Sequence, residues 1–198
     1  MRSAAPVPSS WQEYVCLPAA KLLRVDDALS DDAAAQLLVN PATALGLLEV
    51  LAAPPGEVIL QSAAGSQLGR MVISIAKHRN VRTINVIRTR TGHDAQIAEM
   101  QALGADVVLA ADEDILARVN ELTGGKGVWG ALDAVGGSSP GMLARAVRVG
   151  GTVIVYGALS GTSITLDTMS LIGRSLTVKG YMLPLWLASL SVDGRAQV

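Results

Sequence analysis

A run of small residues follows the first strand of the main predicted sheet, and residues of these types can bind a phosphate group. The segment Ser62-Ala-Ala-Gly-Ser-Gln-Leu-Gly69 lies between this strand and a predicted helix. Small side chains let the backbone approach a pyrophosphate, and a helix N-terminus offers free N–H groups and the positive end of its dipole. Aligned on Gly69, the dinucleotide-binding pattern G-x-G-x-x-G has Ala64 and Ser66 at its first two glycine positions. The placement favours a dinucleotide site, and a plain tight turn is the alternative.

Two arginines, Arg88 and Arg90, follow the second predicted strand of this sheet. NAD-binding proteins usually place an acidic residue here, about 20 residues after the glycine turn, where it binds the ribose 2′-hydroxyl. Arginine instead offers the forked, positively charged donors that suit a 2′-phosphate. The pattern therefore predicts NADP(H) rather than NAD(H), and a solvated charge pair on a loop is the alternative.

Three further segments follow later strands and could lie beside the ribose and nicotinamide of a cofactor: Asp133-Ala-Val-Gly-Gly137, Tyr156-Gly-Ala-Leu159 and Tyr181-Met-Leu-Pro184. Spacing alone favours ordinary turns at the ends of strands. The segment Gly124-Gly-Lys-Gly127 is not a phosphate loop, because Gly127 replaces the required Ser or Thr and the loop precedes a strand. One cysteine, Cys16, and two histidines indicate neither a disulfide framework nor a zinc centre, so no metal is predicted.

The segments that would position these residues alternate between strand and helix. The predicted strands are continuous apolar runs, which is typical of a parallel sheet covered on both faces. The fold class is therefore α/β, a doubly wound six-stranded parallel (Rossmann) sheet in the order 3-2-1-4-5-6. The predicted strands cover 57–61, 81–87, 105–110, 128–133, 151–156 and 175–179. Helices are predicted after the caps Ser30 and Asn40 and over 68–78, 94–103, 112–122, 139–147 and 168–174.

The first 25 residues differ from the rest, with two short predicted strands over 11–15 and 21–24. Two strands do not form a stable sheet alone, so this segment is expected to belong to another domain. Trp11 and Tyr14 are expected to be packing residues, and Cys16 a small buried one. The N-terminus does not resemble a secretory signal, and no apolar run is long enough to predict a membrane span. The low cysteine count fits a reducing environment, so a cytoplasmic location is expected.

Composition limits the function classes. Half of the 198 residues are hydrophobic and 17% are charged, so the chain can bury a substantial core. The formal net charge of −1 argues against nucleic-acid binding, which needs a basic face.

Taken together, the motifs resemble those of the medium-chain dehydrogenase/reductase superfamily. Within it, the chain is most similar to zinc-independent trans-2-enoyl thioester reductases, with quinone oxidoreductases as the nearest relatives. The motifs that carry this resemblance are Trp11-Gln-Glu-Tyr-Val15, Val39-Asn-Pro-Ala-Thr-Ala44, Ser62–Gly69, Thr83-Ile-Asn-Val-Ile-Arg-Thr-Arg90, Leu103-Gly-Ala-Asp106 and Gly150-Gly-Thr-Val-Ile-Val-Tyr-Gly157.

The resemblance implies a GroES-like catalytic domain with a Rossmann domain inserted within it. Residues 1–28 would be a remnant of the catalytic domain, and residues 29–198 would be the NADP(H)-binding domain, truncated before the C-terminal catalytic segment. The family's proposed proton donor is a tyrosine in the missing front part; Tyr14 does not match its motif, so the catalytic residue is unknown and this chain alone is expected to be inactive. A homodimer through the strand over 175–179 is also implied.

The resemblance also assigns the cofactor contacts. Gln67 departs from the family's pattern, in which a glycine is common at this position. The assigned residues are Asn40, Gly65, Ser66, Gln67, Leu68, Gly69, Arg88, Arg90, Tyr156, Gly157, Ala158, Leu159, Tyr181, Met182, Leu183 and Pro184.

The leading function is hydride transfer from NADPH to the C=C bond of a 2-enoyl thioester, as in fatty-acid metabolism. Three alternatives remain open: an NADPH-dependent reductase of quinones or enals, a non-catalytic NADPH-sensing domain, and a methyltransferase-like sheet. The last would need an acidic residue where Arg88 stands.

Overall fold

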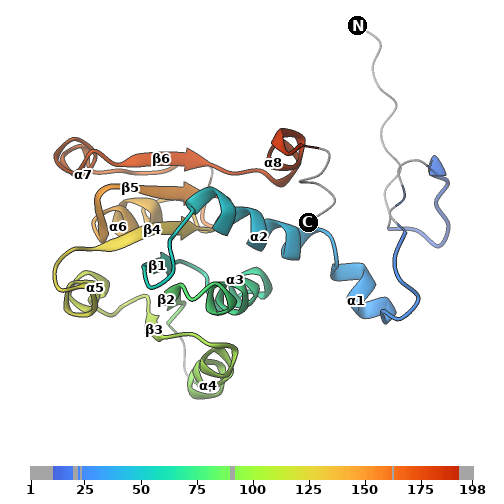
Figure 1. Cartoon of the computed structure of the whole chain (residues 1–198), viewed down its shortest axis with the longest axis horizontal. Helices are drawn as coiled ribbons and strands as arrows, with labels where there is room; N and C mark the ends of the chain where they lie inside the picture. Colours follow the sequence, from blue (N-terminus) through green and yellow to red (C-terminus); the bar gives the residue numbers. More distant parts are fainter. Residues whose placement is uncertain (1–10, 20–21, 23, 90–91, 162, 192–198) are drawn as a thin grey trace, which may run out of the picture. The chain divides into compact units, whose positions relative to one another are not determined.

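The structure, a computed structural model, describes residues 11–19, 22, 24–89, 92–161 and 163–191. The chain divides into two compact units, residues 1–35 and 36–198 (Figure 1). All strands of the described residues lie in the second unit.

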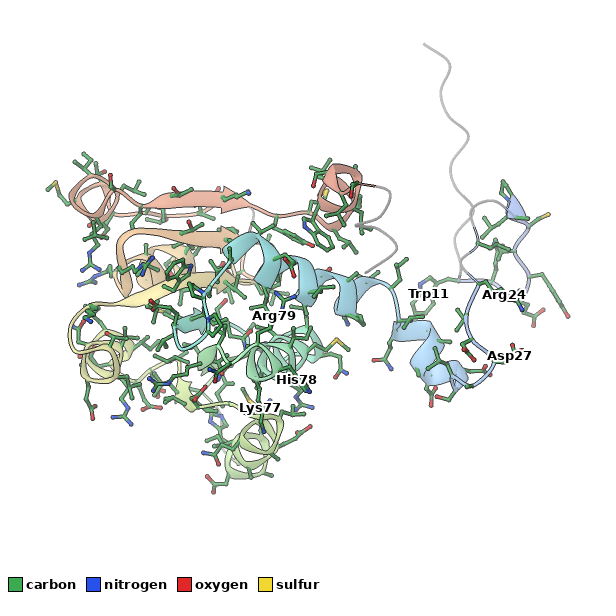
Figure 2. The ribbon with its side chains drawn as sticks, in the orientation of Figure 1. Trp11, Arg24, Asp27, Lys77, His78 and Arg79 are labelled. Atoms are coloured by element: carbon green, nitrogen blue, oxygen red, sulfur yellow. The ribbon has the colours of Figure 1, made fainter. Side chains whose placement is uncertain are left out.

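The described part of the first unit is largely irregular before α1 (Asp31–Gln36). The strand expected over 11–15 is wrong: Trp11 and Tyr14 are 96% and 88% exposed, and no strand of the described residues pairs with this segment (Figure 2). Cys16 is likewise exposed rather than buried. Of the second expected strand, residues 21 and 23 lie outside the described residues. Ser30 caps α1 as expected, its Oγ accepting a hydrogen bond from the Ala33 N–H at 3.3 Å.

The second unit is built on a six-stranded sheet whose strands all run parallel, in the order β3-β2-β1-β4-β5-β6. The predicted fold class and strand order are therefore confirmed. The strands are β1 (Val58–Gln61), β2 (Arg82–Ile87), β3 (Val107–Ala110), β4 (Val128–Asp133), β5 (Val147–Val155) and β6 (Thr177–Gly180).

The apolar strands are long enough to support hydrophobic cores on both faces of the sheet. On one face, Ile59, Leu132 and Ile154 pack against α2 (Val39–Leu51) and α3 (Gln67–His78). On the other, Leu60 and Val153 pack against α5 (Ile115–Thr123) and α6 (Ser139–Ala144). Every residue of β1 is buried, as expected for a central parallel strand covered on both sides.

The remaining helices are α4 (Asp94–Leu103), α7 (Thr168–Arg174) and α8 (Leu183–Ser189). Two helix starts differ from the predictions. Asn40 does not cap α2, which begins at Val39 with Leu38 at the N-cap position, so Asn40 lies inside the first turn. Asp114, rather than Asp112, precedes α5, and its Oδ1 accepts a hydrogen bond from the Ala117 N–H at 3.0 Å.

Two further elements depart from the sequence pattern. β5 begins at Val147, which pairs with Val128 before the register shifts at Gly130. α8, over which the sequence analysis predicted no helix, is a short helix with Pro184 in its first turn. α3 ends as its sequence predicts, with Lys77, His78 and the C-cap Arg79 near the negative end of the helix dipole (Figure 2).

No helix among the described residues is long and apolar enough to cross a membrane.

Candidate cofactor site

The carboxyl ends of β1 and β4 mark the point at which the strand order of the sheet reverses. β1 leads into α3 on one face, whereas β4 leads into α6 on the other. Ligands of open α/β sheets bind outside the carboxyl ends of the strands at such a point. The predicted pyrophosphate turn, residues 62–69, and the glycine-containing turn over 133–137 follow these two strands.

The pyrophosphate turn is ordered by its own side chains. Ser66 is the N-cap of α3, and its Oγ accepts a hydrogen bond from the Gly69 N–H at 3.1 Å. A Cβ at Gly69 would lie 2.5 Å from the carbonyl oxygen of Ala64, so a glycine is needed for the helix to pass this close to the turn. Gly65, Gln67 and Leu68 complete the segment, whose first helical N–H groups have no intrahelical acceptor.

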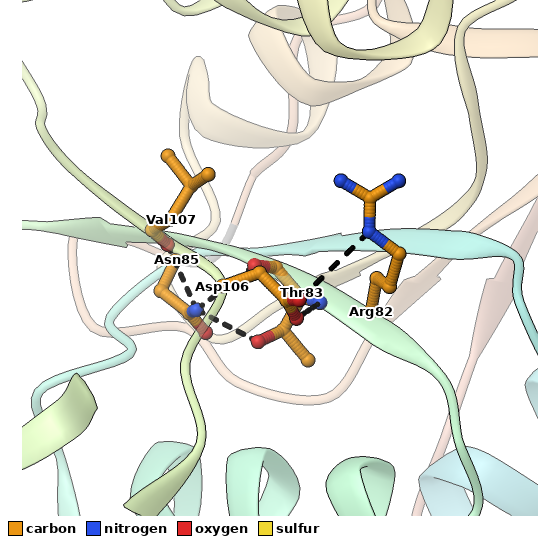
Figure 3. A network of polar contacts seen from close by, with 5 residues as sticks. All are labelled: Arg82, Thr83, Asn85, Asp106 and Val107. Carbon is orange, nitrogen blue, oxygen red and sulfur yellow. Dashed lines mark hydrogen bonds and ion pairs between the residues drawn. The ribbon is translucent and has the colours of Figure 1, made fainter. Parts of the chain in front are cut away.

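Buried polar side chains lie beneath this turn. The Gln61 Nε2 donates hydrogen bonds to the Gly69 carbonyl at 3.0 Å and to the Asn85 Oδ1 at 2.7 Å. The Asn85 Nδ2 donates in turn to the Thr83 Oγ1 and the Val107 carbonyl, both at 2.9 Å (Figure 3). These hydrogen bonds connect α3 to β1, β2 and β3, and they hold the turn before α3 in a defined position relative to the sheet.

Arg88 directly follows β2 and is exposed, as the predicted role at a 2′-phosphate requires. The neighbouring Thr89 donates a hydrogen bond from its Oγ1 to the Asp112 carboxylate at 2.5 Å, which links this loop to the loop after β3. Arg90 lies outside the described residues. Gln96 on α4, which the sequence did not single out, donates from its Nε2 to the Gly65 carbonyl at 3.5 Å.

The segments that follow β4 and β5 are joined to each other by backbone hydrogen bonds. The Ser160 N–H donates to the Val135 carbonyl at 2.8 Å, and the Leu159 N–H to the Ala134 carbonyl at 3.3 Å. A Cβ at Gly157 would collide with that same Ala134 oxygen, so glycine permits the close approach. The structure thus brings together two segments, 133–137 and 156–159, that the sequence placed only at separate strand ends.

Tyr156 and Tyr181 follow β5 and β6 and pack against the core beneath α2. Among the described residues, neither buried hydroxyl oxygen has a hydrogen-bond partner. Burial, with a smaller contribution from the nearby Asp133 carboxylate, raises the pKa of Tyr156. Burial also raises the pKa of Tyr181 from 10.0 to about 12.

Because the pKa values of both tyrosines are raised in the folded chain, we expect the protein to lose stability at high pH. The unfolded chain releases the tyrosine protons near pH 10, whereas the folded chain retains them, so the free energy of unfolding should fall as pH rises from about 10 toward 12. The double change Tyr156→Phe and Tyr181→Phe should flatten this slope in urea titrations, while stability at pH 7 stays equal or rises because each change removes an unpartnered buried hydroxyl. Tyr14→Phe, at a residue 88% exposed, is the control. An unchanged slope in the double variant would contradict this assignment.

The other predicted contacts lie at the same edge of the sheet. Asn40 is half-buried in the first turn of α2. Ala158, Leu159 and Met182 are exposed, and Leu183 and Pro184 begin α8. Sequence reasoning did not single out the hydrogen bond from the Ser62 Oγ to the Asp133 carboxylate at 2.8 Å; the available signal was a polar residue at the end of each of two apolar strands.

Comparison with known proteins finds a dehydrogenase family model and several reductases that are similar to this chain. Residues 68–189 match the family model described as zinc-binding dehydrogenase. The mitochondrial enoyl-[acyl-carrier-protein] reductase of Arabidopsis thaliana is 34% identical over 186 residues, which cover 92% of this chain and 49% of that protein.

Two solved structures show the same fold. A protein described as an NADPH:quinone reductase from Bacillus thuringiensis superposes with a TM-score of 0.80 at 26% identity, over 91% of this chain and 54% of its own. The complex of Etr1p with NADP and crotonyl-CoA superposes with a TM-score of 0.78 at 27% identity, over 85% and 48%. The chain therefore spans about half the length of the proteins it matches.

Proposed function

Since the chain belongs to the zinc-binding dehydrogenase family of the medium-chain dehydrogenase/reductase superfamily, we propose that it is the NADPH-binding part of an oxidoreductase that reduces the C=C bond of a 2-enoyl thioester. The observation that carries this proposal is the 34% identity to an enoyl-[acyl-carrier-protein] reductase over 92% of the chain. The superposition on the Etr1p complex, which contains NADP and crotonyl-CoA, supports the same substrate class.

The described residues fit the cofactor. Gly69 lets α3 pass close to its turn, and the N-cap Ser66 binds the Gly69 N–H while the other N–H groups of the first helical turn have no intrahelical acceptor. A pyrophosphate needs such N–H groups, and a 2′-phosphate needs an exposed positive donor such as Arg88. Residues 65–69 would hold the pyrophosphate, and Arg88 with Arg90 the 2′-phosphate. Asn40, residues 156–159 and residues 181–184 would border the nicotinamide. When bound, the nicotinamide supplies the hydride, and this chain's part is to orient it and exclude water.

A zinc ion does not fit the described residues. Despite the family's name, the part of the chain that the structure describes contains no group of three or more His, Cys, Asp or Glu side chains arranged to hold a metal. No step of the proposed function uses a metal.

A quinone or enal reductase is the second candidate, because the Bacillus thuringiensis NADPH:quinone reductase superposes equally well. We propose residues 1–28 as a remnant of the GroES-like catalytic domain and residues 29–198 as the Rossmann domain, and we expect the chain alone to lack turnover. A cytoplasmic location also stays a prediction; the enoyl reductases that the chain resembles are named as mitochondrial.

Calorimetric titration with NADPH, NADH and S-adenosylmethionine tests the proposal. We expect NADPH to bind most tightly. Binding of S-adenosylmethionine alone would instead support the methyltransferase alternative. If NADPH binds, adding crotonyl-CoA or a quinone to the NADPH-loaded protein distinguishes the two substrate classes by which of them binds.

We also propose a homodimer through β6, the open edge of the sheet. The Tyr181 N–H donates to the Val155 carbonyl, so by strand alternation the Val178 N–H points away from β5, toward the open edge. Val178→Pro should remove this outward donor and yield a monomer in light scattering at micromolar concentration. Val178→Ala loses side-chain volume but keeps the N–H, and it should remain dimeric. A 20.5 kDa particle for the unmutated chain would refute the dimer.

A further inference from the structure

We propose that Asp133 is a positioning residue that couples the pyrophosphate turn to the nicotinamide side of the site. This inference rests on the proposed function and assigns to Asp133 the task of holding the two halves of one dinucleotide site in register.

The Asp133 side chain is fully buried at the end of β4, and its carboxylate accepts four hydrogen bonds. Its Oδ1 accepts from the Ser62 Oγ at 2.8 Å and from the Ser139 Oγ. Its Oδ2 accepts from the backbone N–H groups of Val135 at 3.1 Å and Gly136 at 2.7 Å. A buried carboxylate is tolerated when its oxygens are satisfied in this way, and losing such a set of partners is costly.

One arm of this network leads to the pyrophosphate turn. Ser62 is the first residue after β1, and its backbone N–H donates to the Leu132 carbonyl at 3.0 Å. The Ser62 Oγ, besides donating to Asp133, accepts from the Ala134 N–H at 3.0 Å. The start of the turn is therefore joined to the end of β4 by three hydrogen bonds, two of which involve the Ser62 hydroxyl.

The other part of this network leads to residues 156–159, beside the predicted nicotinamide position. The two N–H groups that Asp133 accepts from shape a turn in which Gly136 and Gly137 have φ angles of +73° and +59°. From this turn the Gly137 N–H donates to the Ser163 carbonyl at 2.9 Å, and the Gly137 carbonyl accepts from the Thr165 N–H at 2.8 Å. The Tyr156 N–H donates to the Asp133 carbonyl at 2.9 Å and the Ser160 N–H to the Val135 carbonyl at 2.8 Å, so residues 156–160 are also joined to the turn that Asp133 organises.

This arrangement differs from an ordinary strand-end turn in what it connects. A turn needs only the two backbone N–H groups, whereas the two serine hydroxyls bring in β1 and α6 as well. The carboxylate therefore links both sides of the point where the strand order reverses. A dinucleotide that spans this point contacts both sides at once, so its affinity depends on their register.

The experiment compares a ligand that spans the site with one that does not. Calorimetry is carried out with NADPH and with 2′,5′-ADP, which carries the adenosine half alone. In Asp133→Asn, we expect NADPH affinity to fall about tenfold while 2′,5′-ADP affinity changes less than about threefold, because coupling between neighbouring groups is of this size. Ser139→Ala removes one donor only and should give a smaller change of the same kind.

Asp106→Asn is the matched control. Asp106 also accepts a backbone hydrogen bond, from the Thr83 N–H at 2.7 Å (Figure 3). Asp106 lies at the amino end of β3, however, whereas Asp133 lies at the carboxyl end of β4. It should leave the ratio of the two affinities unchanged whatever its effect on stability.

Each outcome decides the inference. Equal losses for both ligands, no loss for either, or the same change of ratio in Asp106→Asn would overturn it. If Asp133→Asn does not fold, the ratio measured in Ser139→Ala decides. Failure of the unmutated chain to bind NADPH would overturn the proposed function itself, which separates that result from a failure of this inference.

Discussion

Replacing Arg88 and Arg90 with alanine should remove most of the preference of this protein for NADPH over NADH. Arg88 is exposed directly after β2, where we propose that the 2′-phosphate binds. Charge-assisted hydrogen bonds of this kind contribute about 1–3 kcal/mol. Calorimetric affinities for the two cofactors in the unmutated and double-variant proteins measure the difference directly.

Arg82→Ala is the control for the loss of positive charge. Arg82 begins the same strand and is also exposed, but it lies at the amino end of β2, 3.8 Å from the Asp106 carboxylate. Arg82→Ala should lower the affinities for NADPH and NADH equally or leave both unchanged. Equal affinities of the unmutated chain for NADPH and NADH would rule out the assigned role of Arg88 and Arg90.

Gly69→Ala should both destabilise the protein and weaken cofactor binding, although alanine is the better helix former. A Cβ here would lie 2.5 Å from the oxygen and 2.7 Å from the Cα of Ala64, both backbone atoms, so the turn itself must shift. Overpacking of this kind costs about 1–3 kcal/mol of unfolding free energy. The shift should lower NADPH affinity by about tenfold, since we propose that this turn binds the pyrophosphate.

Gly173→Ala provides the matched control within α7. It is also a helical glycine, but a Cβ at Gly173 would meet no atom within 4 Å. This change should be neutral or stabilise the protein by about 0.5–1 kcal/mol. Urea unfolding of both variants, with NADPH titration of each, separates the clash from helix propensity. Equal stability effects of the two changes would contradict the assigned clash.

Most of the sheet could be predicted because its strands are short apolar runs separated by helical patterns of the right length. β4 matches its predicted bounds of 128–133, and α4 its predicted bounds of 94–103. The N-cap role of Ser30 was also predicted from local chemistry, since a cap bonds to an N–H only three residues further along. Ser66 caps α3 by the same kind of bond, although the sequence analysis did not assign it that role.

The failures occurred where a local preference met a tertiary requirement. Asparagine is a favoured N-cap residue, yet α2 begins at Val39, so Asn40 lies inside the helix. The segment over 11–15 has the composition of a strand, but a strand needs a neighbour for its N–H and C=O groups, and the described residues provide none there. α8 was not predicted, because the helical periodicity of so short an apolar segment is weak.

The sequence by itself determined the class of the fold, the location of the small-residue turn before α3 and the arginine that stands after β2 where an acidic residue is usual. Each of these depends on residues close together in the chain. Only the tertiary structure decided which strand ends meet. Ser62 and Asp133 are 71 residues apart, and they bond because β1 and β4 are neighbours in the sheet. Tyr156 and Tyr181 become neighbours in the same way, through the pairing of β5 with β6. Strand order arises from how the helices cover both faces of the sheet, which depends on the packing of the whole chain and not on any single segment.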